Sequence, residues 1–432
     1  MTDNDNKEED FSLYTEKIVV KPTVKYRKLI RCGQFFLSAC LFGVIASVVM
    51  VFLYPRIESK VSKQDKPSEN LVINKDEYPQ EEVTQEGLPE GEVAPSEEAQ
   101  DEQNKQEGLS EPTSSTTGVG LSDYSSTLKS MVSDIQYSIL AIDIYNTSVD
   151  DFLSENKSTT ETVALVIGQI NGEFILLTDY SMIANSETVI VKLSNSIELT
   201  AEVRGHDESS GIALLGIKLT DIPSNLRGLI KVAQLDNSYK VRQGDIAIAV
   251  GKLYGQVKSC DYCTVTRISS TAATDNAYSV LNTGMVFHSG DYAFLFNSNG
   301  NVIGITKNSD SGFVQAYGVS ELKSMIEGLY NGSGIKYMGI RGQNVTGNLA
   351  TMYGLPMGIY VTDVLVDSPA FNAGLQPGDV IIDFNGNLVL TIQSFSEKLY
   401  QCSSGETVDI TVKRMGKDGY HELNLQAEVA SR

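Results

Sequence analysis

Histidine, cysteine and positive charge are all scarce in this chain of 432 residues. Only 3 histidines are present, His206, His288 and His421. This limits any catalytic or metal site built on imidazole, and we expect neither a metal nor a cofactor. The 5 cysteines are too few for a disulfide framework. Lys and Arg number 34 against 55 Asp and Glu, giving a net charge of -21, so we expect no basic face for nucleic acid.

Charge is missing altogether from residues 35–54, which form an apolar run. As a helix this run would span about 30 Å, the thickness of a bilayer's hydrocarbon core. A cleaved signal peptide is the alternative, but the run is long for one and no small-x-small cleavage site follows. We therefore expect a transmembrane signal anchor in a single-pass protein of the cell membrane. The positive-inside rule places residues 1–34 in the cytoplasm and the main domains outside, because basic residues precede the run: Lys17, Lys21, Lys25, Arg27, Lys28 and Arg31.

Residues 55–121 contain few large apolar side chains and are rich in Glu, Gln, Ser, Pro and Gly. Such a segment buries too little surface to offset the conformational entropy lost on folding. We therefore predict an acidic, disordered linker. Calcium binding by its carboxylates is the alternative, but they lack an ordered ligand spacing.

Residues 122–330 carry short runs of β-branched and aromatic residues, separated by turn residues such as those at 171–172. Strands spaced about 8–12 residues apart are typical of a β-barrel or sandwich. An amphipathic helix is predicted over 128–135, and a second over 320–330 with Ser320 as its N-cap. The expected strands cover residues 163–168, 173–178, 188–193, 198–203, 212–217, 246–251, 263–268, 292–296 and 302–306.

The same region resembles the protease domain of the HtrA/DegP family of trypsin-like serine proteases. Gly172–Ile183 and Gly205–Ile217 are similar to the family segments that carry the catalytic His and Asp, and Val241–Gly251 is similar to a later strand. Phe287–Leu295, followed by Gly300–Ile305, is similar to the nucleophile loop and the strand after it. The resemblance implies a mainly β fold, with a chymotrypsin-like double six-stranded β-barrel over residues 122–330.

The catalytic residues of that family are absent from the matching positions. Its His falls at Ser181, its Asp at Gly211 and its nucleophilic Ser at Asp291, or at Tyr292 if the register shifts by one residue. A serine hydroxyl cannot act as the general base, and glycine has no side chain to orient one. Tyr292, Ala293 and Phe294 also occupy the stretch where an oxyanion hole depends on a glycine-rich backbone. We therefore expect no catalytic residues and a catalytically degenerate, pseudoprotease member.

Two other groups of reactive side chains have ordinary explanations. A triad from Ser289, His206 and Asp207 would need an unexplained rearrangement of the fold. Cys260 and Cys263 form a Cys-x-x-Cys between β-strands, for which either a local disulfide or two free thiols is expected. Zinc would require a second pair of ligands, and none is evident. Cys402 is predicted to be a buried, lone thiol.

Residues 334–429 resemble a PDZ domain of the bacterial HtrA type, most clearly in the Ala-Gly-Leu-x-x-Gly-Asp-x-Ile core within Ser368–Gly386. A PDZ domain adds a peptide as a strand to an exposed sheet edge and binds its terminal carboxylate with backbone N–H groups. The resemblance implies that Tyr337, Met338, Gly339 and Ile340 form the carboxylate-binding loop. A helix over residues 394–400 would form the other wall of the groove, with Phe395 and Leu399 on one face.

Three functions follow as hypotheses. The first is a membrane-anchored HtrA-like pseudoprotease that binds C-termini or unfolded segments of envelope proteins, in protein quality control or regulation of a protease partner. The second is a divergent, active serine endopeptidase of the HtrA/DegP family. The third is a structural envelope scaffold, in which the PDZ loop only completes its sheet. The resemblance also implies a homotrimer or a hetero-assembly with an active HtrA protease.

Overall fold

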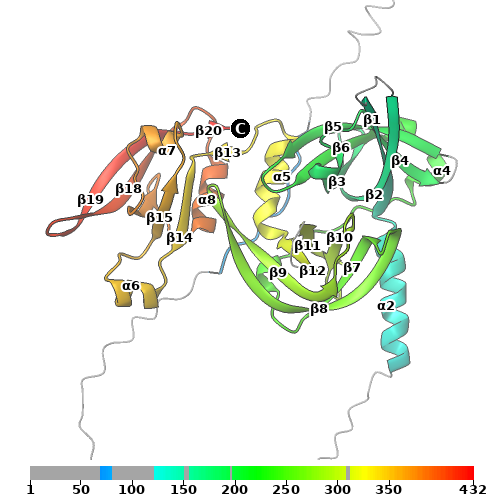
Figure 1. Ribbon diagram of the computed structural model, residues 1–432, viewed down its shortest axis with the longest axis horizontal. Coiled ribbons are helices and arrows are strands. Elements are labelled where there is room, and N and C mark those ends of the chain that lie inside the picture. The colour runs from blue at the N-terminus through cyan, green and yellow to red at the C-terminus, as the bar shows by residue number, and fades with distance from the viewer. Residues whose placement is uncertain (1–68, 80–120, 150–154, 195–196, 308–311) are drawn as a thin grey trace, which may run out of the picture. The chain divides into compact units, whose positions relative to one another are not determined.

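The computed structural model describes residues 69–79, 121–149, 155–194, 197–307 and 312–432 (Figure 1). The predicted cytoplasmic segment 1–34 and the signal anchor 35–54 lie outside these residues. Among the residues that are described, no helix has both the length and the apolar character needed to cross a membrane.

Two closed six-stranded barrels follow helix α2 (Leu121–Gln136), as the double-barrel prediction requires. In the first, neighbouring strands run in the order β1-β2-β3-β6-β5-β4, and in the second β10-β11-β12-β9-β8-β7. The first barrel contains β1 (Ile139–Val149), β2 (Glu155–Ile170), β3 (Glu173–Asp179), β4 (Thr188–Ser194), β5 (Ile197–Asp207) and β6 (Ile212–Lys218). The second contains β7 (Ile246–Leu253), β8 (Gln256–Ala273), β9 (Asn276–Val286), β10 (Tyr292–Phe296), β11 (Val302–Lys307) and β12 (Phe313–Gly318).

Strand β3 shows why some strands read as unbroken apolar runs. Side chains of a strand alternate between its two faces. Phe174 and Leu176 belong to the core inside the first barrel, whereas Ile175 and Leu177 belong to a core shared with the second barrel. All seven residues of the strand are therefore buried. The strand ends at Asp179, two residues before Ser181.

Three strands of the two barrels, β1, β9 and β12, lie where the sequence predicts none. In β9 the apolar alternation is obscured by buried polar residues that find partners in the folded chain. Thr283, for example, is 4% exposed and its hydroxyl donates to the carbonyl of Val314 at 3.1 Å. The sequence also assigns His206 and Asp207 to a turn, but both belong to β5.

Short helices connect the strands and close the protease-type domain. They are α3 (Tyr180–Ile183), α4 (Ser224–Arg227), α5 (Lys323–Tyr330) and the 3-10 turns Leu219–Asp221, Ser238–Lys240 and Ser320–Leu322. The prediction that Ser320 caps the last helix is wrong. Its hydroxyl instead donates to Asp76 at 2.7 Å and accepts from the amide of Ser238 at 2.8 Å.

The C-terminal domain has a sheet in the order β14-β15-β16-β18-β19, with a β13–β20 pair beside it. Its core includes an edge-to-face contact between Phe384 and Phe395, with ring centroids 4.9 Å apart. Thr391 caps helix α8, which begins two residues earlier than the helix predicted from the sequence. The elements are β13 (Lys336–Tyr337), β14 (Ile340–Asn344), α6 (Gly347–Tyr353), β15 (Ile359–Val364), α7 (Pro369–Asn372), β16 (Val380–Phe384), β17 (Asn387–Leu388), α8 (Ile392–Gln401), β18 (Thr407–Gly416), β19 (Gly419–Glu428) and β20 (Ala430–Ser431).

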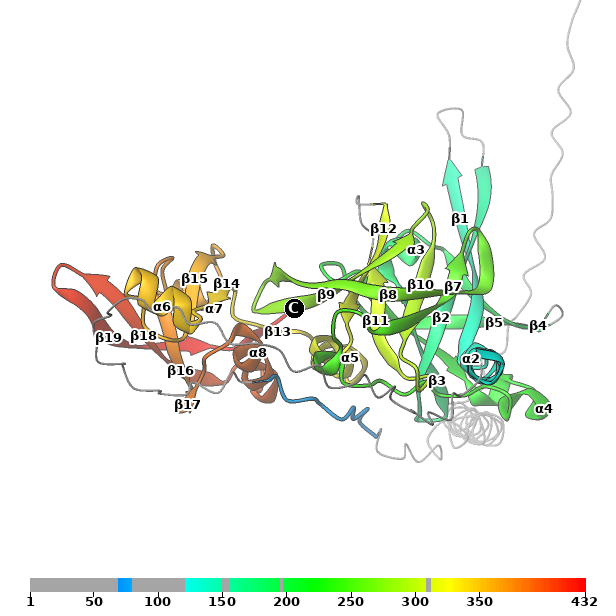
Figure 2. The same ribbon diagram turned by 90° about the horizontal axis from the view of Figure 1, so that it is seen from below.

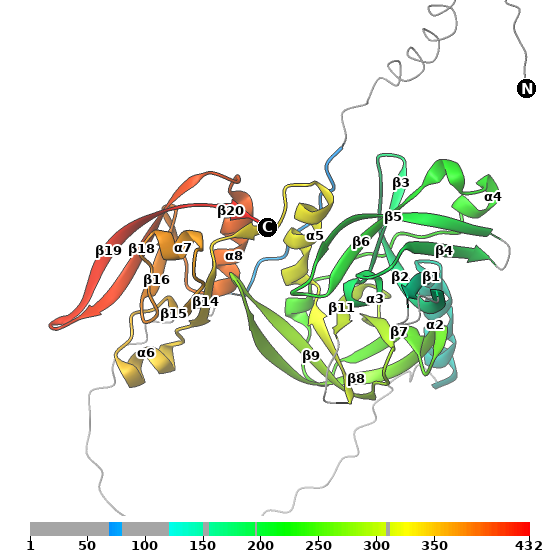
Figure 3. The ribbon, with the colours of Figure 1, turned by 45° about the horizontal axis from the view of Figure 1, so that its top comes forward.

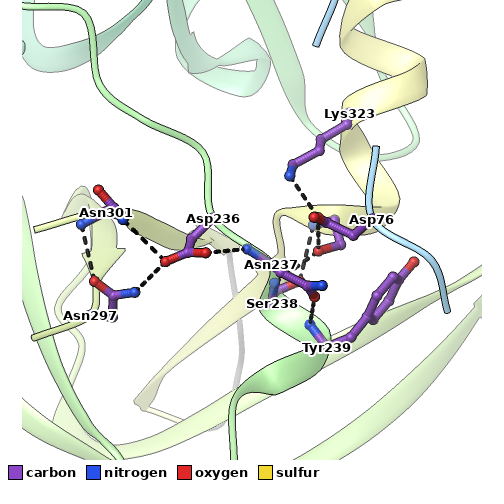
Figure 4. Close-up of polar contacts among 9 residues, drawn as sticks. Asp76, Asp236, Asn237, Ser238, Tyr239, Asn297, Asn301 and Lys323 are labelled. Carbon is purple, nitrogen blue, oxygen red and sulfur yellow. Dashed lines mark hydrogen bonds and ion pairs between the residues drawn. The ribbon is translucent and has the colours of Figure 1, made fainter. Parts of the chain in front are cut away.

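Residues 69–79, here called the docked linker segment, correct the prediction of a wholly disordered linker (Figure 2). Leu71 is 7% exposed and packs into the core shared by the barrels. The carboxylate of Asp76 lies 2.6 Å from the ammonium of Lys323, whose side chain is only 2% exposed (Figure 4). A buried lysine needs an anionic partner, and this acidic segment supplies one. The segment contains too few apolar residues for the sequence to predict that it packs against the barrels.

Candidate functional site

The segments expected to hold the base and its orienting acid meet at the end of β3. Asp179 caps helix α3, and its carboxylate accepts from the amide of Ser181 at 2.8 Å. The amide of Tyr180 donates to the carbonyl of Gly211 at 2.8 Å. A β-carbon at position 211 would lie 3.8 Å from the Asp179 carboxylate. The structure thus brings Ser181 and Gly211 to one place, although neither side chain is that of a base or an acid.

Asp291, at the expected nucleophile position, lies in a loop that closes on itself before β10. Its carboxylate accepts from the amides of His288 at 3.1 Å and Gly255 at 3.4 Å. Its own amide donates to the carbonyl of His288 at 3.0 Å. An oxyanion hole needs amides that point at the substrate rather than at the chain. In this arrangement the amide of Asp291 donates to its own loop and does not point at a substrate.

Tyr292 follows Asp291 and points into the protein near Asp179. The residue is 3% exposed, and its hydroxyl has no hydrogen-bond partner among the described residues. Burial raises the pKa of the Tyr292 phenol well above its ordinary value, and the charge of Asp179 adds to this. Burial also raises the pKa of Asp179. A phenol that stays protonated is neither a base nor an activated nucleophile at neutral pH.

The alternative triad is not assembled. The ring of His206 stacks on Tyr180 with centroids 4.3 Å apart. The carboxylate of Asp207 accepts from the Ser209 hydroxyl at 2.6 Å and so is held by its own turn. Within the described ranges, no hydrogen bond or ion pair joins Ser289 to His206 or Asp207.

The expected carboxylate-binding loop of the C-terminal domain does hold a carboxylate. The amides of Met338, Gly339 and Ile340 donate to the side chain of Asp275, with the shortest distance 2.8 Å from each. Asp275 lies at the tip of the hairpin formed by β8 and β9, 63 residues before Met338. Asp275 is absent from the residues predicted from the sequence, because no pattern in the hairpin indicates so distant a partner.

Gly339 is required in this loop for two reasons. Its φ of +89° is a conformation that residues with a β-carbon rarely adopt. A β-carbon there would also lie 2.2 Å from that of Ser368. The loop is therefore built for close backbone approach, and three consecutive amides are left to point at one anion.

Burial raises the pKa of Asp275 to about 6, against the opposing effect of the three amides and of Arg432. Asp275 is only 4% exposed, so the contact between the two domains is almost completely shielded from solvent at this residue. The amide of Asp275 also donates to the carbonyl of Ile340 at 2.8 Å. Side chain and backbone therefore both engage the loop.

The other predicted binding residues surround this contact. Met338, Ile340, Phe395 and Leu399 are all 0% exposed and pack in one core that also contains Ala277 of the hairpin. Tyr337 is half-buried. Its ring has the guanidinium of Arg432 at 5.7 Å. The hairpin tip thus packs against the residues that were predicted to line a groove.

The cysteines do not form a further site. Cys260 and Cys263 are free thiols on the single strand β8, where residues three apart lie about 10 Å from each other and point to opposite faces. That separation exceeds what a disulfide can bridge. Cys402 is free and buried, as predicted. In the part of the chain that the structure describes, no three His, Cys, Asp or Glu residues come together as a metal site.

Comparison with known proteins supports both domains. The PDZ domain family model matches residues 336–425. A protein named "Probable periplasmic serine endoprotease DegP-like" from Hahella chejuensis is 28% identical over 265 residues, covering 59% of this chain and 54% of the relative. "Serine protease Do-like HtrA" from Lactobacillus helveticus is 28% identical over 296 residues, covering 62% of this chain and 69% of that protein. The chain spans about half the length of the first of these relatives.

Solved structures show the same fold. The structure described as "HtrA-type protease AlgW with decapeptide" has a TM-score of 0.54 at 21% identity and covers 70% of this chain and 98% of its own. The tripeptide complex of the same protein has a TM-score of 0.54 at 23% identity. This chain therefore combines an HtrA/DegP-type serine protease fold with a C-terminal PDZ domain.

Proposed function

We propose that this chain is an HtrA-like pseudoprotease that binds peptides or C-termini of envelope proteins through its PDZ domain. The observation that carries the proposal is the convergence of three consecutive amides, at Met338, Gly339 and Ile340, on one carboxylate. A loop that holds an aspartate in this way has the donors that a peptide's terminal carboxylate requires. Such a protein would act in extracytoplasmic protein quality control or regulate a protease partner.

Loss of catalysis is the second part of the proposal. Ser181 and Gly211 stand where a base and its orienting acid are needed, and the Asp291 carboxylate is turned into its own loop. The purified chain should leave casein intact. Hydrolysis that a serine-directed inhibitor abolishes would overturn this part.

A divergent, active endopeptidase is the alternative, favoured by relatives that are named serine endoproteases. It predicts that Ser289→Ala removes an activity present in the unmutated chain. A structural envelope scaffold predicts instead that the chain binds no member of a library of C-terminal peptides. The three functions therefore differ in two assays, casein hydrolysis and peptide binding.

The cellular place and assembly of the protein are part of the proposal. Relatives named periplasmic support an extracytoplasmic location for the two folded domains. We propose that residues 35–54 anchor them to the cell membrane, and that the chain forms a homotrimer or assembles with an active HtrA protease. Alkaline extraction of membranes tests the anchor, and light scattering of the purified chain tests the assembly.

A further inference from the structure

The hairpin formed by β8 and β9 reaches from the second barrel to the PDZ domain, where its tip lies beside β14 and α8 (Figures 1 and 3). We propose that Asp275 at this tip is an internal ligand of the PDZ domain, so that a peptide C-terminus binds only after the hairpin withdraws. This inference rests on the proposed peptide-binding function and assigns its regulation.

The side chain of Asp275 uses the whole carboxylate site. Its Oδ1 accepts from Gly339 and Ile340, both at 2.8 Å, and its Oδ2 accepts from Met338 at 2.8 Å and Gly339 at 2.9 Å. A second carboxylate cannot share these three amides, because two anions would occupy one buried position. Binding of Asp275 and binding of a peptide terminus are therefore mutually exclusive.

The backbone around Asp275 also takes the place of a peptide. The Asp275 amide donates to the carbonyl of Ile340, the first residue of β14. Two residues on, the carbonyl of Ala277 accepts from the side-chain amide of Gln393 on α8 at 3.3 Å. The methyl group of Ala277 packs in the PDZ core. The tip therefore contacts both walls of the groove, as an added strand would.

The contact is local, which makes its release feasible without unfolding either domain. Asp275 lies in a tight turn with a φ of +60°, at the end of the 18-residue strand β8. Most of β8 beyond Val265 is not buried, so its end is held chiefly by pairing with β9. Withdrawal of the tip would expose three amides and the apolar side chains of Met338 and Ile340. A peptide with a free carboxylate and an apolar last residue would accept from these amides and cover these side chains.

The cost of withdrawal lowers the affinity that is measured for a peptide. When only a fraction of molecules is competent, the apparent dissociation constant rises by the inverse of that fraction. Removal of the Asp275 carboxylate should therefore tighten binding without any new contact to the peptide.

The test uses the full chain in detergent and C-terminal peptides selected from a random heptapeptide library on Asp275→Ala. Fluorescence anisotropy then compares the unmutated chain with Asp275→Ala. Asp363→Ala is the matched control, because it removes an aspartate from β15 of the same domain and leaves the loop intact. We expect binding at least tenfold tighter in Asp275→Ala, unchanged binding in Asp363→Ala, and little binding of the amidated peptides.

Hydrogen exchange of residues 336–341 provides a readout that needs no peptide. We expect slow exchange of the loop amides in the unmutated chain and fast exchange in Asp275→Ala. Equal peptide affinities, or equal exchange in the two chains, would overturn the internal ligand while leaving peptide binding intact. Fast exchange in Asp275→Ala with no peptide bound by either chain would instead overturn the proposed function, and the regulatory role with it.

Discussion

Asp275 is a buried carboxylate whose surroundings shift its pKa in opposite directions. Burial raises the pKa to about 6, while the amides of 338–340 and the charge of Arg432 lower it. The phenols of Tyr337 and Tyr400 also face this carboxylate, and its charge helps to raise their pKa values. On a withdrawn hairpin, Asp275 would regain its ordinary pKa of 3.8. The contact with the PDZ loop therefore binds a proton more tightly than the released tip does.

A pH dependence of peptide binding follows from that difference. Because the pKa is higher in contact with the loop, acid favours the contact, and this advantage is lost as pH rises through about 6. We expect apparent peptide affinity to rise about tenfold between pH 5 and pH 7 and then to level off. Anisotropy titrations across this range measure it. The rise should be absent in Asp275→Ala, and a rise that persists there would assign the effect to another group.

Glu321 is a second buried carboxylate, at 7% exposure, on the protease-type domain. The hydroxyl and amide of Ser279 donate to one of its oxygens, while the other has no partner among the described residues. Burial raises its pKa from 4.5 to about 7. Ionisation of Glu321 therefore opposes folding at neutral pH and above.

Replacement of Glu321 by Gln tests this cost. The unmutated chain should lose roughly 2–3 kcal/mol of unfolding free energy as pH rises from 4.5 to 8, because its folded form must release a tightly held proton. Glu321→Gln should remove that loss, so the unfolding free energy of the variant, relative to that of the unmutated chain, should be higher at pH 8 than at pH 5. Urea denaturation at the two pH values measures the difference. Parallel stability curves for the two chains would contradict the assignment.

At the scale of elements, a buried ion pair helps to hold the docked linker segment. Asp76 neutralises Lys323, which is 2% exposed at the start of α5 (Figure 4). Asp76→Ala should cost about 3–5 kcal/mol of unfolding free energy, or release the segment, because a buried ammonium loses its partner. Guanidinium denaturation of the full chain measures the loss.

The same segment offers a matched control for that measurement. Lys75 pairs with Glu327 at 2.8 Å, but its side chain is 43% exposed. Lys75→Ala should therefore cost no more than about 1 kcal/mol. Equal losses for Asp76→Ala and Lys75→Ala would show that burial of the Asp76–Lys323 pair is not what holds the segment.

At the scale of the molecule, the two folded domains communicate through the hairpin. A peptide that displaces Asp275 should free residues 270–277 while its own carboxylate takes over the amides of residues 338–340. Hydrogen exchange of the full chain with saturating peptide should therefore rise in the first segment and stay slow in the second. Slow exchange retained in both segments would mean that peptide and hairpin bind together.

The sequence alone determined the two folded domains. Short apolar runs such as those of β3 and β7 identify strands, because both faces of these strands are buried. The Ala-Gly-Leu core of the PDZ domain is likewise a pattern of neighbouring residues. Such features need only neighbouring residues to be recognised. Strand β9 was not predicted, because its buried polar side chains interrupt the apolar pattern and their partners lie on other strands.

Only the tertiary structure decided what occupies the candidate binding site. Asp275 looks like any turn aspartate until folding brings it to Gly339, 64 residues away. Asp76 likewise looks like part of a solvated linker until it meets Lys323, 247 residues later. In both contacts, a carboxylate accepts hydrogen bonds from buried donors that lie far away in the sequence. Chain-local patterns report burial and turns, whereas the pairing of buried charges depends on the completed fold.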